Sequence, residues 1–441
     1  EKGVSILPRG GGTSQCGQTV NEALVLDNTQ YFNDILELDV QNRRCVVRPG
    51  IVLDELNRAL KPHGLWFPVD VSTSSRATIG GMTGNNSCGG KSLRYGMMRD
   101  NVLSIEAFLA DGSKHSFSGE NGNGAEKYKA LSDEMMQLGM REAAEIEVRF
   151  PKVMRRVGGY NIDALLPKNT PNNLAHLLVG SEGTLGVITE ICLKLHGIPE
   201  SIAAGVCPFA TIEDACNAAI TCIQMGVPIA RVELIDAENL KALNAYSKLE
   251  LKEVPTLFVE FHGTQAGARE QIETFASIVE ELGGGPFDWA TKEEDRLKLW
   301  QARHDAYWAI KAMVPGKETL GTDVCVPISK LAECVEQTRE DLDEHDLYGP
   351  ILGHVGDGNF HVVLFCDRND PVEVKATEEF LYRLAMRAIA MEGTCTGEHG
   401  IGSGKRKFLE AEHGAGVAVM RSIKQALDPK NIMNPGKILP G

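Results

Sequence analysis

The sequence predicts an α+β protein built in two parts, and two patterns in the chain lead to that prediction. Up to about residue 197, short apolar runs with strand character alternate with three clusters of glycine and other small residues. Beyond residue 198, helical stretches alternate with apolar strands. Such alternation is typical of a sheet covered by helices, so we expect an open sheet with helices against it in the second part.

Local patterns place the elements of the first part. A helix is expected over 54–63, and a loop followed by a helix over 119–150. The chain begins without Met and with a strand already under way, so we expect the natural N-terminus to precede Glu1. Strands are expected at 4–7, 23–26, 44–47, 102–110 and 187–195.

In the second part the helices and strands follow one another along the chain. The run Lys405-Arg406-Lys407 is interpreted as a solvated basic turn, and a last helix is expected over 411–427. Earlier helices are expected over 211–225, 265–282, 328–344 and 372–391. Strands are expected over 231–235, 256–261, 322–326 and 361–365.

Composition excludes several classes of protein. A chain of 441 residues suggests two to three domains, and no apolar run reaches the roughly 20 residues of a membrane helix. The net charge of −15 argues against binding to nucleic acid or to anionic membranes. The 11 cysteines include no Cys-x-x-Cys, which argues against a zinc ribbon or an iron–sulfur cluster. Those in apolar runs are expected to be small core residues.

Three glycine-rich loops predict a site for a large, phosphate-bearing ligand. The loop at 9–14 (Arg-Gly-Gly-Gly-Thr-Ser) follows a strand, and its glycines let backbone N–H groups turn inward around a phosphate. It matches neither the Gly-x-Gly-x-x-Gly fingerprint nor the nucleotide-hydrolase loop. Small residues also dominate 68–90 and 180–188, which leaves room for a flat ligand against bare backbone. Three such loops exceed what structural turns require.

Two histidines and a Glu-His pair predict a metal site. In Gly353–His361, Asp357-Gly358 favours a type I′ turn, which would place His354 opposite His361 with Cβ atoms about 4.5–5.5 Å apart. The loop at 396–402 supplies Glu398 and His399 between glycines. Each histidine alone would more often be a hydrogen-bonded structural residue. Together His354, His361 and Glu398 form a set with open positions, as catalytic cations require, and we expect Zn²⁺ or Mn²⁺.

The order of these motifs resembles the flavoproteins of the vanillyl-alcohol oxidase or PCMH type. The loop at 9–14 comes first, followed by Thr-Ile-Gly-Gly at 78–81, Gly-Ser-Glu-Gly-Thr-Leu-Gly at 180–186 and Asn-Pro-Gly-Lys at 434–437. Within these flavoproteins the chain is most similar to the D-lactate dehydrogenase and D-2-hydroxyacid dehydrogenase branch, over nearly its whole length.

This resemblance implies a domain organisation. A PCMH-type FAD-binding domain would occupy 1–197. An α+β cap domain, with an antiparallel sheet covered by helices and the metal site, would occupy 198–404. The segment 405–441 would return to the FAD domain.

The resemblance also implies how FAD is held. Some relatives attach FAD through a histidine in the first loop; that loop has none here, so we expect non-covalent FAD. The pyrophosphate would lie on 10–14, with Glu182, Gly186 and Ile188 near the adenosine. The residues expected at the cofactor are Arg9, Gly10, Gly11, Gly12, Thr13, Ser14, Pro68, Thr78, Gly80, Gly81, Thr83, Gly84, Asn85, Glu182, Gly183, Gly186, Ile188 and Asn434.

The same resemblance assigns catalytic roles. His399 would be the general base, and Arg303 would grip the substrate carboxylate, although a charged surface helix is the alternative for Arg303. The implied reaction oxidises a D-2-hydroxy acid to the 2-keto acid with hydride transfer to flavin N5. The acceptor of the electrons would be a cytochrome, a quinone or an electron-transfer flavoprotein. The bacterial cytoplasm is the expected location, with the mitochondrial matrix as the alternative, and a homodimer is left open.

Two positions favour D-lactate as the substrate. Relatives that oxidise D-2-hydroxyglutarate carry Lys and Asn where this chain has Gly321 and Val363. A distal carboxylate would lack a partner there, unless Arg296 or Lys311 supplied one, and an unpaired buried charge is costly. D-2-hydroxyglutarate and glycolate remain alternatives.

Two further interpretations from other classes are weaker. A flavin-free metal hydrolase would leave the glycine-rich loops unexplained. A non-catalytic flavin-binding subunit would leave the cluster of histidines and Glu398 unexplained.

Overall fold

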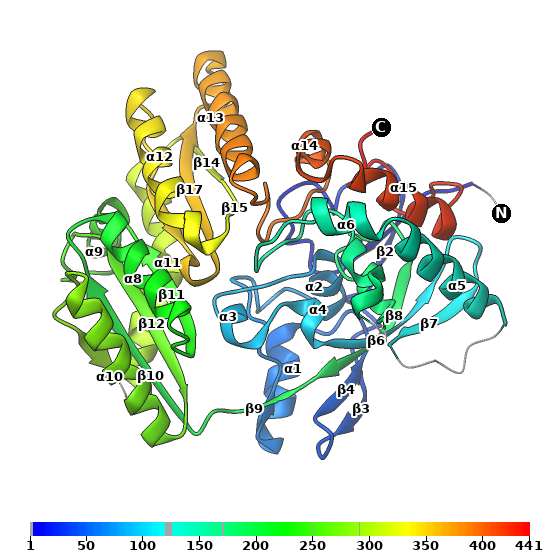
Figure 1. The fold of residues 1–441 in the computed structure, drawn as a ribbon, viewed down its shortest axis with the longest axis horizontal. Coiled ribbons are helices and arrows are strands. Elements are labelled where there is room, and N and C mark those ends of the chain that lie inside the picture. The colour runs from blue at the N-terminus through cyan, green and yellow to red at the C-terminus, as the bar shows by residue number, and fades with distance from the viewer. Residues whose placement is uncertain (1–2, 120–125, 170–171, 249, 291) are drawn as a thin grey trace.

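The computed structural model describes residues 3–119, 126–169, 172–248, 250–290 and 292–441. Its elements form two lobes, which lie side by side in Figure 1. Most of the loop expected before the helix at 126 falls outside the described residues. None of the helices in the described part of the chain combines the length and apolar character of a membrane span.

The first lobe is built on a five-stranded antiparallel sheet, of which β8 is the central strand. The strand expected at 44–47 has those bounds, whereas the strands at the two edges of the sheet were not expected. In spatial order the strands are β3 (Ile35–Asp39), β4 (Arg44–Val47), β8 (Val187–Lys194), β6 (Val102–Phe108) and β7 (Lys114–Ser118).

Helices and short segments cover this sheet. The first helix buries Leu53, Leu56 and Leu60 on one face, as its apolar spacing dictates. Two short strands, β5 (Leu65–Trp66) and β9 (His196–Gly197), pair with each other. The helices are α1 (Leu53–Leu60), α2 (Ile79–Asn85), α3 (Ser92–Tyr95), α4 (Met98–Asn101), α5 (Glu126–Arg141), α6 (Ala143–Arg149) and α7 (Ala175–Leu178).

The two ends of the chain meet on the first lobe. Strands β1 (Ile6–Arg9) and β2 (Leu24–Asp27) pair in parallel. The Ile6 amide donates to the Ile432 carbonyl, and the Asn434 amide donates to the Ile6 carbonyl. The helix expected at 411–427 is divided into α14 (Leu409–His413) and α15 (Gly416–Leu427).

The second lobe is one antiparallel sheet, as expected. The strand expected at 322–326 covers only Val324–Cys325 in the structure, and a separate strand that was not expected, Glu318–Gly321, precedes it. The strands in spatial order are β13 (Asp288–Ala290), β10 (Ser201–Pro208), β12 (Thr256–Gly263), β11 (Ile229–Ile235), β16 (Ile351–Gly353), β17 (Asn359–Cys366) and β14 (Glu318–Gly321), with β15 (Val324–Cys325) also on β17.

Helices cover both faces of this sheet, and strand alternation decides which residues meet them. Residues Val232, Val259 and Phe360 pack against one set, which comprises α8 (Ile212–Gln224), α10 (Gln265–Glu281), α12 (Leu331–Glu344) and α13 (Pro371–Ala390). Residues Ile235, Leu352 and Val363 pack on the other face with α9 (Ala237–Ser247) and α11 (Glu293–Met313). This second face is the one turned toward the site described below.

Replacing Phe261 by alanine should destabilise the second lobe by about 3–5 kcal/mol, because the cavity left behind cannot close. The ring is fully buried and meets Phe275 edge-on at 5.6 Å between centroids. Denaturant unfolding followed by circular dichroism measures the loss. Val372→Ala, at a position 73% exposed, is the matched control. Equal midpoints for the two variants would contradict this account of the core.

Candidate active site

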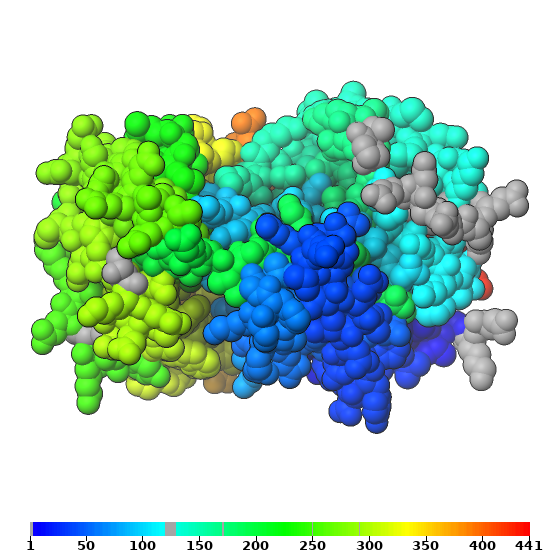
Figure 2. Space-filling model, turned by 90° about the horizontal axis from the view of Figure 1, so that it is seen from below, coloured from blue at the N-terminus to red at the C-terminus, as the bar shows by residue number. Residues whose placement is uncertain are grey.

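A cavity of about 790 Å³ opens between the two lobes, within the usual size range of small-molecule sites. Figure 2 shows the lobes in contact along a seam, with the green and yellow second lobe beside the blue and cyan first lobe. Loops of the first lobe form one wall. The other wall comes from β11, β16, β17 and α11 of the second lobe.

The glycine-rich loops converge on this cavity, although they are far apart in the sequence. The structure places sixteen of the eighteen residues expected at the cofactor in its lining. These are Arg9, Gly10, Gly11, Gly12, Thr13, Ser14, Pro68, Thr78, Gly80, Gly81, Gly84, Asn85, Glu182, Gly183, Gly186 and Ile188.

Glycine is required in the first loop because the loop lies directly against the start of α2. A Cβ on Gly10 would come within 2.0 Å of Thr78 Oγ1, and one on Gly11 within 2.2 Å of the Arg76 carbonyl oxygen. At Gly84 a Cβ would meet no other atom closer than 4.0 Å and would project toward open space. The lining therefore exposes backbone at several glycines, which fits a large ligand that carries phosphate groups, such as FAD.

Two of the expected cofactor residues lie elsewhere. Thr83 is fully buried within α2 and donates its hydroxyl hydrogen to the Ile79 carbonyl. Asn434 donates its side-chain amide to the carbonyls of Gln18 and Glu182. Neither residue lines the cavity, and the side-chain polar groups of both are engaged by other residues of the protein.

Residues of the first lobe grip the loop that carries Glu398 and His399. The Glu182 carboxylate accepts the N–H groups of Ile401 and Gly402, at 2.7 and 2.8 Å. Asn85 donates to the Glu398 carbonyl at 2.8 Å. Burial raises the pKa of Glu182 to about 7, and the hydrogen bonds from the loop oppose that rise. Two residues expected to face the cofactor, Asn85 and Glu182, thus also position the loop that carries Glu398 and His399.

The predicted metal ligands come together. One donor atom from each of His354, His361 and Glu398 lies within 4.8 Å of the others. The His354 Nδ1 donates to Glu233 at 2.7 Å, and the His361 Nδ1 donates to the Thr322 carbonyl at 2.8 Å. Each imidazole therefore turns Nε2 toward Glu398, as metal-bound histidines do when their other nitrogen is engaged. The donor set fits Zn²⁺ or Mn²⁺.

The prediction that a two-residue turn places His354 opposite His361 is wrong. Strand β17 pairs with β16 so that His361 lies opposite Leu352, not opposite His354. The reason is that Val355–Asp357 form a turn of 3-10 helix, which lengthens the connection beyond a two-residue hairpin. Gly358 follows in the left-handed conformation, with φ of +83°. The histidine rings still lie 5.8 Å apart between centroids.

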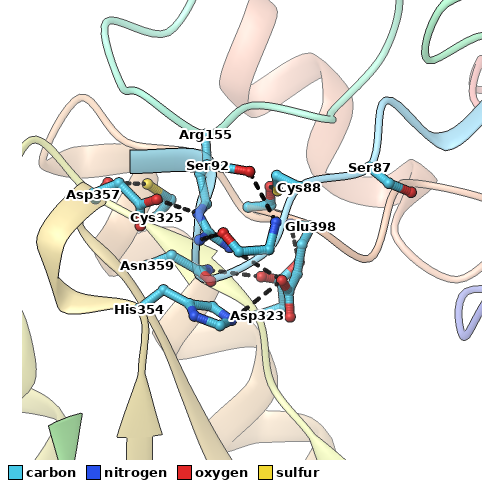
Figure 3. A network of polar contacts seen from close by, with 12 residues as sticks. Ser87, Cys88, Ser92, Arg155, Asp323, Cys325, His354, Asp357, Asn359 and Glu398 are labelled. Atoms are coloured by element: carbon cyan, nitrogen blue, oxygen red, sulfur yellow. Dashed lines mark hydrogen bonds and ion pairs between the residues drawn. The ribbon is translucent and has the colours of Figure 1, made fainter. Parts of the chain in front are cut away.

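A buried arginine that the sequence did not single out holds this cluster (Figure 3). The side chain of Arg155 is 1% exposed; its Nε donates to Asp357 at 2.6 Å and its Nη1 to Glu398 at 3.1 Å. Its Nη2 donates to the Gly89 carbonyl of the first lobe. Burial alone would raise the pKa of Glu398, but the imidazoles of the two histidines hold that pKa well below its usual value.

Asp323 fixes the loop that carries Glu398 and His399 from the side of the second lobe. Its carboxylate accepts the N–H groups of Glu398 and His399, at 3.0 and 2.8 Å. Lys405, expected in a solvated turn, is instead only 18% exposed at its side chain and donates to the Asp323 carbonyl at 3.1 Å. Burial lowers the pKa of His399, against the opposing effect of Asp323, so the imidazole is suited to accept a proton.

Arg303 lies on α11 and reaches the cavity. Its side chain is 12% exposed, which excludes the alternative of a solvated surface position. Its Nη2 donates to Glu233 at 3.0 Å, whereas its Nε has no hydrogen-bond partner among the described residues. Arg231 also lines the cavity, with its guanidinium 3.8 Å from the centroid of the Trp300 ring. Neither Arg231 nor Glu233 was singled out from the sequence. The signal that could have found them is the presence of two charged residues in an otherwise apolar strand.

Comparison with known proteins identifies the family. The model described as "FAD linked oxidases, C-terminal domain" matches residues 198–438, and the model described as "FAD binding domain" matches residues 1–118. The chain belongs to the FAD-linked oxidases. The predicted resemblance is thereby confirmed, and FAD is confirmed as the cofactor of the family.

Relatives of this FAD-linked oxidase carry related names. "Probable D-lactate dehydrogenase, mitochondrial" of Danio rerio is 40% identical, over 99% of this chain and 80% of its own length. "D-lactate dehydrogenase [cytochrome], mitochondrial" of Arabidopsis thaliana is 36% identical, over 99% of this chain and 69% of its own length. "D-2-hydroxyglutarate dehydrogenase" of Pseudomonas putida is 31% identical, over 99% of this chain and 45% of its own length. A 4-ethylphenol oxidase structure from Gulosibacter chungangensis shares the fold, with a TM-score of 0.71 and 16% sequence identity. The match covers 99% of this chain and 85% of that one.

The burial of Glu182 should make stability depend on pH, because its effect on the pKa outweighs that of the hydrogen bonds from the loop at 396–402. The folded pKa of about 7 lies above the ordinary value of 4.5, so the folded state binds the proton more tightly. The free energy of unfolding should therefore fall as pH rises from about 4.5 to 7, by about 3 kcal/mol at most. Urea unfolding of the wild type and Glu182→Gln at pH 5 and pH 8 measures this. The advantage of the wild type should shrink at pH 8; a constant or growing advantage would contradict the assignment.

Proposed function

We propose that this FAD-linked oxidase oxidises a small monocarboxylic D-2-hydroxy acid, with D-lactate favoured, and that it uses a divalent cation together with FAD. One observation carries the proposal. His354, His361 and Glu398 converge beside His399 on the same cavity that the glycine-rich loops line. Cation ligands, a base and the cofactor loops thus face one substrate.

The residues divide the work between them. FAD, when bound by the glycine-rich loops, supplies the flavin that accepts a hydride from C2 of the substrate. A cation at His354, His361 and Glu398 would lower the pKa of the substrate hydroxyl. Arg303 binds the substrate carboxylate through its donors that Glu233 does not occupy. His399 takes the hydroxyl proton at Nε2, the ring nitrogen on the side of Glu398. Loss of that proton and the hydride leaves the 2-keto acid.

The wall of the cavity favours a substrate without a second carboxylate. Gly321 and Val363 are direct partners across β14 and β17, and both line the cavity. Neither cation considered as a compensator reaches this wall. Arg296 donates to the Ile202 carbonyl, Lys311 lies beside the Trp308 ring, and neither belongs to the lining. D-2-hydroxyglutarate and glycolate remain the alternative substrates.

The relatives bear on acceptor and location. A D-lactate dehydrogenase named for a cytochrome supports a cytochrome as electron acceptor, ahead of a quinone or an electron-transfer flavoprotein. Relatives named as mitochondrial support the mitochondrial matrix over the bacterial cytoplasm. A homodimer stays a prediction that a sizing experiment would test.

Removing the cation should abolish turnover while FAD stays bound, because the three ligands face the substrate and not the glycine-rich loops. Dialysis against a chelator, followed by elemental analysis and an assay with a dye acceptor, measures this. Zn²⁺ or Mn²⁺ should restore activity, and the flavin absorbance should not change throughout. Full turnover by protein verified as metal-free would refute the cation's role.

Substitution of the base and the anion anchor should have different effects. His399→Ala should lower kcat by roughly 10²–10⁴-fold with unchanged flavin content. Arg303→Ala should lower kcat/KM mainly through a higher KM, because a carboxylate ligand is lost. Lys298→Ala, on the same helix but 78% exposed at its side chain, is the control and should match the wild type. Wild-type kinetics in Arg303→Ala would remove Arg303 from the site.

The pair Gly321 and Val363 should set preference between mono- and dicarboxylic substrates. A Cβ added at Gly321 would meet no atom within 4 Å, so a longer side chain can begin there without a clash. The wild type should favour D-lactate over D-2-hydroxyglutarate in kcat/KM, and Gly321→Lys with Val363→Asn should shift that ratio at least tenfold toward the diacid. Gly321→Ala is the control. A wild-type preference for the five-carbon diacid would show that another group receives the distal carboxylate.

A further inference from the structure

A single buried carboxylate joins the predicted cation ligand to the predicted anion anchor. Glu233 lies in β11 and is 0% exposed. Its Oε1 accepts from His354 Nδ1 at 2.7 Å and from Arg231 Nε at 2.9 Å. Its Oε2 accepts from Arg303 Nη2 at 3.0 Å. The donors come from three separate elements, β11, the turn after β16, and α11.

The burial of this carboxylate makes its partners interdependent. Arg231 and Arg303 are themselves largely buried, at 7% and 12% exposure, so each depends on Glu233 as its counter-charge. Removing one member of such a group leaves the other charges uncompensated in a low-dielectric setting. The two oxygens belong to one rigid plane, so a change at Glu233 itself reaches both Arg303 and His354.

We propose that Glu233 is a positioning residue that couples the cation site to the binding of the substrate carboxylate, an inference that rests on the proposed function. Through Oε1 it fixes the His354 tautomer and leaves Nε2 free to bind the cation. Through Oε2 it holds Nη2 of Arg303 and leaves the remaining guanidinium donors for an anion in the cavity that Arg303 lines. Cation affinity and substrate KM therefore respond together to a change at this one residue.

Two variants test the coupling. Glu233→Gln keeps the size of the side chain, but an amide offers one acceptor and one donor and cannot accept from both sides. Glu233→Asp keeps the charge but withdraws the carboxylate by one methylene group. Zn²⁺ affinity is measured on FAD-loaded, metal-depleted protein by competition with a chromogenic chelator, without substrate. KM for D-lactate is measured at saturating Zn²⁺.

Both variants should lose Zn²⁺ affinity by roughly 10–100-fold, as is typical when the partner of a metal-bound histidine is altered, and should raise KM at least tenfold. Arg303→Met should raise KM while Zn²⁺ affinity stays within twofold of the wild type. Asp341→Asn is the matched control, because Asp341 is a buried carboxylate that also pairs with two arginines, Arg383 and Arg387, away from the cavity. It should change neither quantity.

The outcomes separate this inference from the proposed function. If the wild type does not bind Zn²⁺ or Mn²⁺, the cation role fails and the coupling fails with it. If the wild type binds the cation but a folded Glu233 variant keeps either Zn²⁺ affinity or KM within twofold, only the coupling is refuted. Should Glu233→Gln fail to fold, Glu233→Asp supplies both measurements, since its charge still compensates the two arginines.

Discussion

The loop that bears Glu398 and His399, the proposed metal ligand and the proposed base, is held between two buried carboxylates, one from each lobe. Asp323 accepts the N–H groups of Glu398 and His399 from the second lobe. Glu182 accepts those of Ile401 and Gly402 from the first lobe. The conformation of the loop therefore depends on contacts with both lobes. This explains why the predicted cation ligands lie at the wall of the cavity that the glycine-rich loops line.

Several ion pairs between acidic and basic side chains surround this loop. Buried ion pairs contribute little net stability, because desolvation offsets the attraction between the charges. Their value here is geometric, since each carboxylate fixes a histidine, a guanidinium or a stretch of backbone relative to the cavity. The acidic members are Glu233, Asp323, Asp357 and Glu398, and the basic members are Arg155, Arg231, Arg303 and Lys405.

The sequence predicted what short motifs encode. Glycine clusters and the two histidines with a Glu-His pair are local signals, and the structure brings both to one cavity. The turn after His354 was predicted as a two-residue hairpin, because the preference of Asp-Gly for type I′ turns does not register a preceding turn of 3-10 helix. Arg155 could not be found, because its partners, Gly89, Asp357 and Glu398, are remote in the sequence and only tertiary contacts reveal them.

The central claim is that a cation binds at the meeting point of the lobes, beside the flavin cavity. Anomalous X-ray diffraction at the absorption edge of zinc or manganese, from crystals of the FAD-loaded enzyme, tests it most directly. The account predicts one anomalous peak about 2.0–2.2 Å from Nε2 of His354, Nε2 of His361 and a carboxylate oxygen of Glu398. A fully loaded protein with no peak there, or with its peak on other residues, would contradict the account.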